Sequence, residues 1–265
     1  MLVKGEVGLN IIQKLKKNQF LFAQLVHRDF TQKYKRTVLG IAWSVLSPLL
    51  TLLVMNIIFG TLLGANIEHY TIYLFTGQLI FSFFNDSTNE GMTSLLNNAE
   101  IFTKVNVPKY MFLFSKNISS LINFGITLGI YFVFVAINGI PFTWKFVLLL
   151  FPILCLVVFN LGMGLILSAL YVFFRDIQYL YSIFTMLLMY MSAIFYSIDT
   201  FPQIGKNLFL LNPIYVYIRY FRKIVIEGDI PSIWLHLAAL GYAVAAFGIG
   251  AWIYKKKNHS FLYYV

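Results

Sequence analysis

The sequence predicts an all-α membrane protein. Its expected parts are an N-terminal amphipathic interface helix, six transmembrane helices, and a re-entrant helical hairpin on the outer side between the fifth and sixth helices. Two observations predict this class. Hydrophobic residues make up 59% of the 265 positions, charged residues only 11%, and the mean hydropathy is +0.76, which is too apolar for a soluble domain. Lys and Arg are gathered in short clusters between long apolar runs, as in chains that cross a bilayer several times.

The distribution of basic residues also predicts the orientation of the chain. An even number of spans places both termini on one side, and the positive-inside rule makes that side the cytoplasm. The predicted organisation is a cytoplasmic segment over 1–37, a transmembrane domain over 38–254 and a cytoplasmic tail over 255–265. Because the net charge of +10 comes from these clusters, we expect a membrane surface and no nucleic acid as the partner. The basic residues that remain outside are Lys145, Lys206, Arg219, Arg222 and Lys223.

Residues 10–26 are expected to form the amphipathic helix, because at 100° per residue their apolar side chains fall on one face. The three lysines Lys14, Lys16 and Lys17 fall away from that face, towards anionic headgroups. Phe20 breaks the pattern by pointing to the polar side. Two interpretations of Phe20 stay open: an exposed aromatic residue without a role, or a contact for a cytoplasmic partner.

The spans follow from the apolar runs. The stretch 28–48 passes from a basic run into an uncharged one and leads into the first span. Small residues in the fourth span, Gly162 and Gly164, allow a neighbouring helix to approach closely. The six predicted spans cover about 38–63, a run that starts near 70, and then about 110–137, 144–174, 179–196 and 233–254.

Two connections differ from simple loops. Residues 97–109 carry Pro108, which stops a helix, and two lysines. Residues 198–231 hold two short apolar pieces, 201–211 and 213–226, each too short to cross a bilayer. This second segment predicts a re-entrant hairpin or a pair of surface helices.

A polar patch interrupts the end of the second apolar run. Asp86 and Glu90 lie four residues apart and therefore share a helix face. Charges inside a membrane usually face a bundle interior or an aqueous cavity, which favours a functional role. The alternative is that the patch already lies at the cytoplasmic interface, solvated or paired with basic residues.

The residues that an enzyme would need are not gathered. The four histidines are scattered, without the spacing of metal ligands, so we expect no metal and no catalytic site. The sequence has no GxxxxGK[ST] phosphate loop, so this chain is not expected to bind ATP in that manner. A membrane transferase that uses Asp86 and Glu90 stays open as an alternative.

A series of short motifs runs in order along nearly the whole chain. Their residues are Arg28, Asp29, Tyr34, Leu39, Gly40, Trp43 and Pro48, then Asn98, Lys104 and Pro108, then Gly162, Gly164, Ser168, Phe173, Phe174, Arg175 and Asp176, then Phe195, Tyr196, Ser197, Asn212, Pro213, Phe221 and Arg222. In this order the motifs resemble those of the permease subunit of ABC-2-type exporters, which move lipid-linked polysaccharides such as O antigen, capsule or teichoic acid out of bacteria. Lys33 and Thr37 depart from the family pattern, where Arg and Ser are more usual.

The resemblance implies a multi-pass protein of the bacterial inner membrane that works as a homodimer with a channel between the two copies. It also implies a separate ATP-binding subunit that binds ATP and Mg, so that this chain itself holds no cofactor. In this family the N-terminal helix and the loop after the second span contact that subunit. The candidate contacts are Phe20, Asn98, Glu100, Lys104 and Pro108.

The implied cargo suggests two further groups of residues. Aromatic rings stack on sugars, so the aromatic channel-lining candidates are Phe81, Phe84, Tyr190, Phe195 and Tyr196; packed or lipid-facing aromatic residues are the alternative. Asp86 and Glu90 of the polar patch are the acidic channel-lining candidates. Basic residues attract a lipid diphosphate, so its candidates are Arg28, Lys33, Lys35 and Arg36 inside and Arg219 and Arg222 outside. Anchoring to headgroups, or holding the hairpin in place, is the alternative for these. The alternative functions are a permease for teichoic acid or for small molecules and drugs, and a membrane enzyme acting on lipid-linked sugars.

Overall fold

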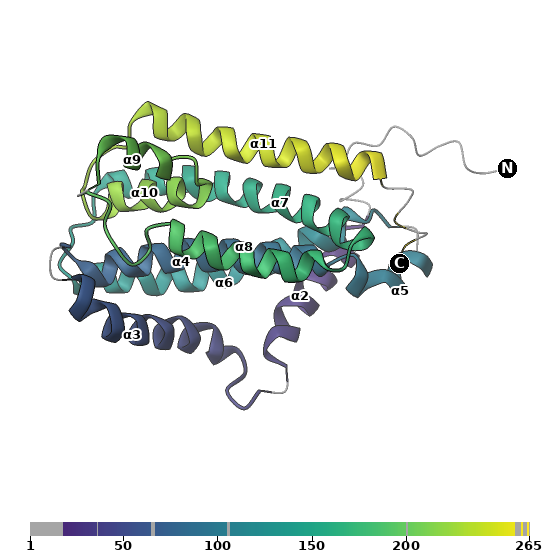
Figure 1. Cartoon of the computed structure of the whole chain (residues 1–265). Helices are drawn as coiled ribbons and strands as arrows, with labels where there is room; N and C mark the ends of the chain where they lie inside the picture. Colours follow the sequence, from purple (N-terminus) through teal and green to yellow (C-terminus); the bar gives the residue numbers. More distant parts are fainter. Residues whose placement is uncertain are drawn as a thin grey trace.

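The computed structural model describes residues 18–35, 37–64, 67–104, 107–199 and 201–257, with residues 261 and 264, and these residues form helices, turns and irregular connections. In chain order the helices are α2 (Gln19–Tyr34), η1 (Gly40–Ala42), α3 (Trp43–Leu63), α4 (Tyr70–Thr93), η3 (Leu96–Asn98), α5 (Ala99–Lys104), α6 (Tyr110–Ile137), η4 (Trp144–Leu149), α7 (Leu150–Phe173), α8 (Ile177–Met191), α9 (Gln203–Phe209), α10 (Pro213–Val225) and α11 (Ile233–Lys257). The long helices lie side by side in one bundle (Figure 1). Helices α2 and α5 and the end of α11 lie at one end, and α9 and α10 lie at the other.

Four helical segments in the described part of the chain are long and apolar enough to cross a membrane. They are Gly40–Leu63, Tyr110–Ile137, Trp144–Phe173 and Ile233–Lys257. Their bounds agree within a few residues with the predicted first, third, fourth and sixth spans. For the described residues, the prediction of a helical chain with several apolar segments of membrane-spanning length is therefore confirmed.

Helix α4 lies at the centre of the bundle and contacts α3, α6, α7, α8 and α10. It is 24 residues long but more polar than the four segments above. Its hydroxyl groups are paired inside the bundle: Thr76 Oγ1 lies 2.8 Å from the Tyr131 hydroxyl, and Tyr181 donates to Thr88 Oγ1 at 2.6 Å. Pairing of this kind offsets the cost of placing polar groups away from water.

Helices α7 and α11 run side by side in close contact. A Cβ atom on Gly162 would overlap the backbone of Ala246 and Phe247, and one on Gly250 would meet the carbonyl oxygen of Gly162. The absence of side chains at these two positions is therefore what lets the two backbones touch. The predicted close helix approach at Gly162 is confirmed.

The outer helices present apolar side chains to their surroundings. Helix α3 lies at the edge of the bundle (Figure 1), and only Ser44 and Leu52 are buried on it. Helix α8 buries only Tyr181 and Thr185. Exposed leucine, isoleucine and aromatic side chains on both helices are suited to lipid or to another protein surface.

Two predicted helix bounds are wrong. The first helix continues beyond residue 26 to Tyr34, because Leu25 and Asp29 continue its buried face against α6. The fifth apolar run ends its helix at Met191 rather than near 196, because the chain turns at Ala193, which has a φ of 49°. The part of the predicted amphipathic helix before residue 18 lies outside the described residues.

The segment before the last span forms two short helices, as the sequence predicts. Helix α9 is largely exposed, whereas nearly all of α10 is buried against α4, α7 and α11. Asn212 caps α10 by accepting hydrogen bonds from the backbone N–H groups of Ile214 and Tyr215, and Pro213 occupies the first helical position. Helix α10 is thus part of the bundle rather than a helix on its surface.

Candidate functional site

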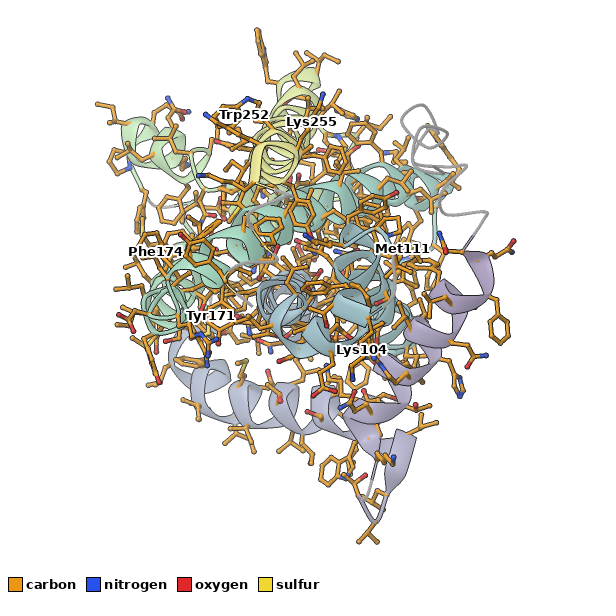
Figure 2. All side chains as sticks on the ribbon, turned by 90° about the vertical axis from the view of Figure 1, so that its right-hand side faces the viewer. Lys104, Met111, Tyr171, Phe174, Trp252 and Lys255 are labelled. Carbon is orange, nitrogen blue, oxygen red and sulfur yellow. The ribbon has the colours of Figure 1, made fainter. Side chains whose placement is uncertain are left out.

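Helices α2 and α5 form one end of the molecule, which faces the viewer in Figure 2. Phe20 is 78% exposed on α2, in agreement with its predicted direction away from the apolar face. Glu100 and Lys104 are exposed on α5, and Lys104 lies at this end in Figure 2. Pro108 is half-buried and Asn98 is buried. Of the predicted subunit contacts, three are therefore open to a partner.

A buried carboxylate joins α2 to the rest of the bundle. The Asp29 side chain is fully buried and lies between two cations, with Arg28 Nη2 at 2.8 Å and Lys116 Nζ at 3.3 Å. Ser115 Oγ donates a third contact at 2.8 Å. A buried carboxylate is tolerated only when it is paired and hydrogen-bonded in this way.

Arg28 extends this network to the connection after α4. Its Nη2 group also donates to Asn98 Oδ1 at 2.8 Å, while Asn98 Nδ2 donates to the carbonyl oxygen of Ser94 at 2.7 Å. The predicted diphosphate residue Arg28 and the predicted subunit contact Asn98 thus bind each other. This pair links η3 directly to α2.

A second ion pair joins α2 to α4. Lys33 Nζ lies 2.7 Å from Asp86 Oδ2 and 3.6 Å from Glu90 Oε1. Burial by itself lowers the pKa of Lys33, but the two carboxylates outweigh it and the net shift is upward. Asp86 and Glu90 are therefore paired with a basic residue, as in one of the interpretations that the sequence leaves open. The positive charge of Lys33 is already balanced by these carboxylates.

Of the two remaining inner diphosphate candidates, Lys35 lies in the described part of the chain. Lys35 ends α2 and is exposed. Arg36 lies outside the described residues.

At the other end of the bundle, Arg222 on α10 is only 3% exposed. Its guanidinium donates to the carbonyl oxygens of Ala193 at 2.8 Å, Ile194 at 3.2 Å and Tyr73 at 3.0 Å. The guanidinium carbon also lies 3.3 Å from the centre of the Tyr73 ring. Arg222 thus fixes α10 to α4 and to the turn after α8, which supports the alternative that it holds the hairpin in place.

The other charges of this region are paired near the surface. Arg219 forms an ion pair with Glu227, and Lys223 lies 2.8 Å from Glu227 and 3.4 Å from Asp229. The hydrogen bond that Lys223 donates to Glu227 is the main reason that the pKa of Lys223 is raised. These ion pairs join the end of α10 to the connection that leads to α11.

The predicted channel-lining aromatics fall into two groups. Phe81, Phe84 and Phe195 are at most 7% exposed and pack against rings of their own chain. Tyr190 is 55% exposed on α8, and half-buried Tyr196 donates to its carbonyl oxygen at 2.9 Å. The exposed Tyr190 is therefore the aromatic candidate that another molecule can reach in this arrangement. A channel-lining role for the whole group stays a prediction.

Asp29 lies at the centre of the network that joins α2 to the bundle, and this position and its partners Ser115 and Lys116 were not predicted from the sequence. A signal for it was present, because Asp29 follows Phe22 and Leu25 at spacings of seven and four residues and so falls on the apolar helix face. A carboxylate on that face predicts a buried partner. The identity of the partner depends on the packing of α6 and is not readable from the spacing.

Comparison with known proteins gives the family. The sequence model of the ABC-2 type transporter family matches residues 20–226. An O-antigen export system permease protein RfbA of Klebsiella pneumoniae is 29% identical over 79% of this chain and 82% of its own length. One of Myxococcus xanthus is 26% identical over 96% of this chain and 98% of its own length. The capsule polysaccharide export inner-membrane protein CtrC of Neisseria meningitidis serogroup A is 23% identical over 75% of this chain and 76% of its own length. The chain therefore belongs to the ABC-2 type transporter family.

Proposed function

We propose that this chain is the membrane-spanning permease of a transporter that exports a lipid-linked polysaccharide, O antigen or a similar polymer, across the inner membrane. ATP hydrolysis is assigned to a separate subunit, and the chain itself acts as a transport subunit rather than an enzyme. The observation that carries this proposal is the nearly full-length similarity to a protein named as an O-antigen export permease. Similarity that covers 96% of this chain leaves little of it for an unrelated activity.

The proposed topology has six spans and places both termini in the cytoplasm. It adds α4 and α8 to the four apolar segments, with α9 and α10 as a hairpin on the outer side. At about 1.5 Å per residue the 24 residues of α4 extend roughly 36 Å, enough for a hydrocarbon core of about 30 Å. The 15 residues of α8 extend only about 22 Å, and the turn and hairpin that follow would complete the crossing.

The proposed docking surface for the ATP-binding subunit is the end formed by α2 and α5. Phe20, Glu100 and Lys104 are exposed there, and the Arg28–Asn98 pair connects the surface to the bundle. We expect Glu100→Arg and Lys104→Glu to lower the ATPase activity that the permease stimulates, since each change reverses a charge at the contact. Membrane insertion should be unchanged, because neither side chain is buried.

A chain with Lys206→Glu, a charge reversal on α9 at the opposite end, is the matched control for this test. Normal stimulation by both α5 variants would remove this surface from the proposed contact.

Deletion of the gene in a polymer-producing host tests the function itself. We expect polymer to disappear from the cell surface while lipid-linked polymer accumulates on the inner face, and the wild-type gene should restore export. Unchanged surface polymer, together with loss of resistance to a small toxic compound, would favour the small-molecule permease. Loss of synthesis of the lipid-linked sugar, rather than of its export, would favour the membrane enzyme.

A further inference from the structure

A cavity of about 510 Å³ lies inside the chain between the end of α2 and helices α3, α4 and α6. Its volume is within the roughly 300–1,000 Å³ of ordinary small-molecule sites. Hydroxyl and amide groups line it from three long helices: Ser47 and Thr51 from α3, Gln78 and Ser82 from α4, and Ser120 and Asn123 from α6. So many polar groups among apolar spans are unusual where a cavity serves only to face lipid.

Several of these polar groups have unused hydrogen-bonding capacity. Gln78 Nε2 donates to Ser82 Oγ at 2.9 Å, but Gln78 Oε1 is buried and has no donor in the described part of the chain. The Tyr34 hydroxyl donates to Asn123 Oδ1 at 2.8 Å, while Asn123 Nδ2 has no acceptor there. Ser120 is only 2% exposed, and its hydroxyl also lacks a partner among the described residues. A ligand that both donates and accepts hydrogen bonds would satisfy all three.

The charges of the cavity decide which ligand fits. Among the described residues, the charged ones in its lining are Lys33 and Asp86, and they form an ion pair at 2.7 Å. Glu90 adds a second carboxylate on the same lysine at 3.6 Å. A phosphodiester, such as the diphosphate bridge of a lipid-linked sugar, only accepts hydrogen bonds, so it would leave Gln78 Oε1 unpaired and would lie beside carboxylates. An uncharged hydroxylated ligand can donate a hydrogen bond to Gln78 Oε1 and is not repelled by the carboxylates.

The apolar part of the lining is aromatic. Rings of Trp43, Phe75, Phe83 and Phe124 line the cavity beside the hydroxyl and amide groups. Aromatic faces cover the apolar C–H faces of a sugar ring, while hydroxyl and amide groups reach its oxygens. The same combination serves a simple alcohol poorly, since an alcohol has too few hydroxyl groups for three unpaired positions.

We propose that this cavity is a binding site for an uncharged sugar. The inference rests on the proposed function for one of its two possible sources, the glycan of the exported lipid-linked polymer. The other source is the neutral sugar headgroup of a membrane glycolipid. The residues that line the site belong to a single chain, and they include Asp86, one of the channel-lining candidates.

Cysteine labelling tests the proposal on the full-length permease. Cys155 is replaced by Ala, and Ser47→Cys or Thr127→Cys provides a thiol on the α3 or the α6 side of the cavity. Ser232→Cys, exposed between α10 and α11, is the matched control. Each variant is reconstituted in phosphatidylcholine vesicles and labelled with N-ethylmaleimide. The added probes are the host's extracted lipid-linked polymer, monoglucosyldiacylglycerol, or phosphatidylglycerol.

We expect the polymer or the glucolipid to slow labelling of both cavity thiols about fivefold at about four times its Kd, because labelling falls as 1/(1 + [L]/Kd). The control thiol should be unaffected, and the probe that protects identifies the source. Gln78→Met, which removes the unpaired acceptor, should restore labelling towards the unprotected rate. Protection by phosphatidylglycerol alone, equal slowing of all three thiols, or no slowing with either sugar probe would overturn the proposal.

The same vesicles separate this proposal from the export function. With the partner ATPase added, polymer transport without protection of the cavity thiols would refute the sugar site and leave the export function standing. Protection of the cavity thiols by the glucolipid, without any polymer transport, would support the sugar site and refute the export function.

Discussion

Basic residues hold the two ends of this bundle together in different ways. At the α2 end, Arg28 and Lys33 are each about one-third exposed and pair with carboxylates on their own helix or a neighbouring one. At the α10 end, Arg222 is buried, and its partners among the described residues are backbone carbonyls and a tyrosine ring. An ion pair within reach of water is weak and can be exchanged, whereas a buried guanidinium without a carboxylate is held by the fold around it. The Lys33–Asp86 contact at the α2 end is thus suited to rearrangement, whereas the fully buried Asp29 anchors the rest of α2 and the α10 end is suited to rigidity.

The largest effect is expected from Arg222→Leu. The change removes the guanidinium donor from three buried carbonyl oxygens, and each one that is left unpaired costs about 1–3 kcal/mol; the Ala193 oxygen keeps the Tyr73 hydroxyl at 3.4 Å. We expect the protein to fail to accumulate in the membrane. Arg222→Lys keeps the charge and should recover part of the yield, measured by size-exclusion chromatography in detergent. Wild-type yield and thermal stability of Arg222→Leu would show that α10 is held by its apolar contacts alone.

A smaller but substantial effect is expected from Asp29→Asn. The change leaves Lys116 and Arg28 without their buried counter-charge, which typically costs about 3–5 kcal/mol when a buried pair is broken. Since Arg28 is partly exposed and keeps Asn98 as a partner, we expect the low end of that range. The loss is read as a lower unfolding temperature in detergent. An unchanged unfolding temperature would contradict the anchoring role of Asp29.

The smallest effect on stability is expected from Lys33→Gln. Both partners are partly exposed, so the pair with Asp86 should contribute about 0.2–1 kcal/mol. A double-mutant cycle with Asp86→Asn measures that coupling directly. A coupling well above 1 kcal/mol would mean that the α2 end is as rigid as the α10 end and would remove the distinction.

Four of the spans could be predicted from the sequence, because each is a continuous apolar run. The segments Gly40–Leu63, Tyr110–Ile137, Trp144–Phe173 and Ile233–Lys257 follow from hydropathy, because each exposes enough apolar surface for lipid. The end of α8 could not be predicted from hydropathy. The apolar run continues to residue 196, but the helix stops because the carbonyl groups of Ala193 and Ile194 turn towards Arg222.

The sites were less predictable than the spans, because their partners are far apart in the chain. Lys33 and Asp86 were both singled out, but as a diphosphate contact and a channel-lining residue rather than as a pair. Their contact depends on the angle at which α2 meets α4, which no spacing encodes. The unpaired groups of Gln78 and Asn123 likewise become visible only when α4 and α6 are packed together.

Transport by a purified complex tests the central claim most directly. The permease and its ATP-binding partner are reconstituted in vesicles with the cytoplasmic face outward, and lipid-linked polysaccharide is supplied on that face. The account predicts that polymer becomes protected from an added glycosidase only with ATP and only when this chain is present. Equal protection without the chain, or ATP-dependent transport of a small molecule but not of the polymer, would contradict it.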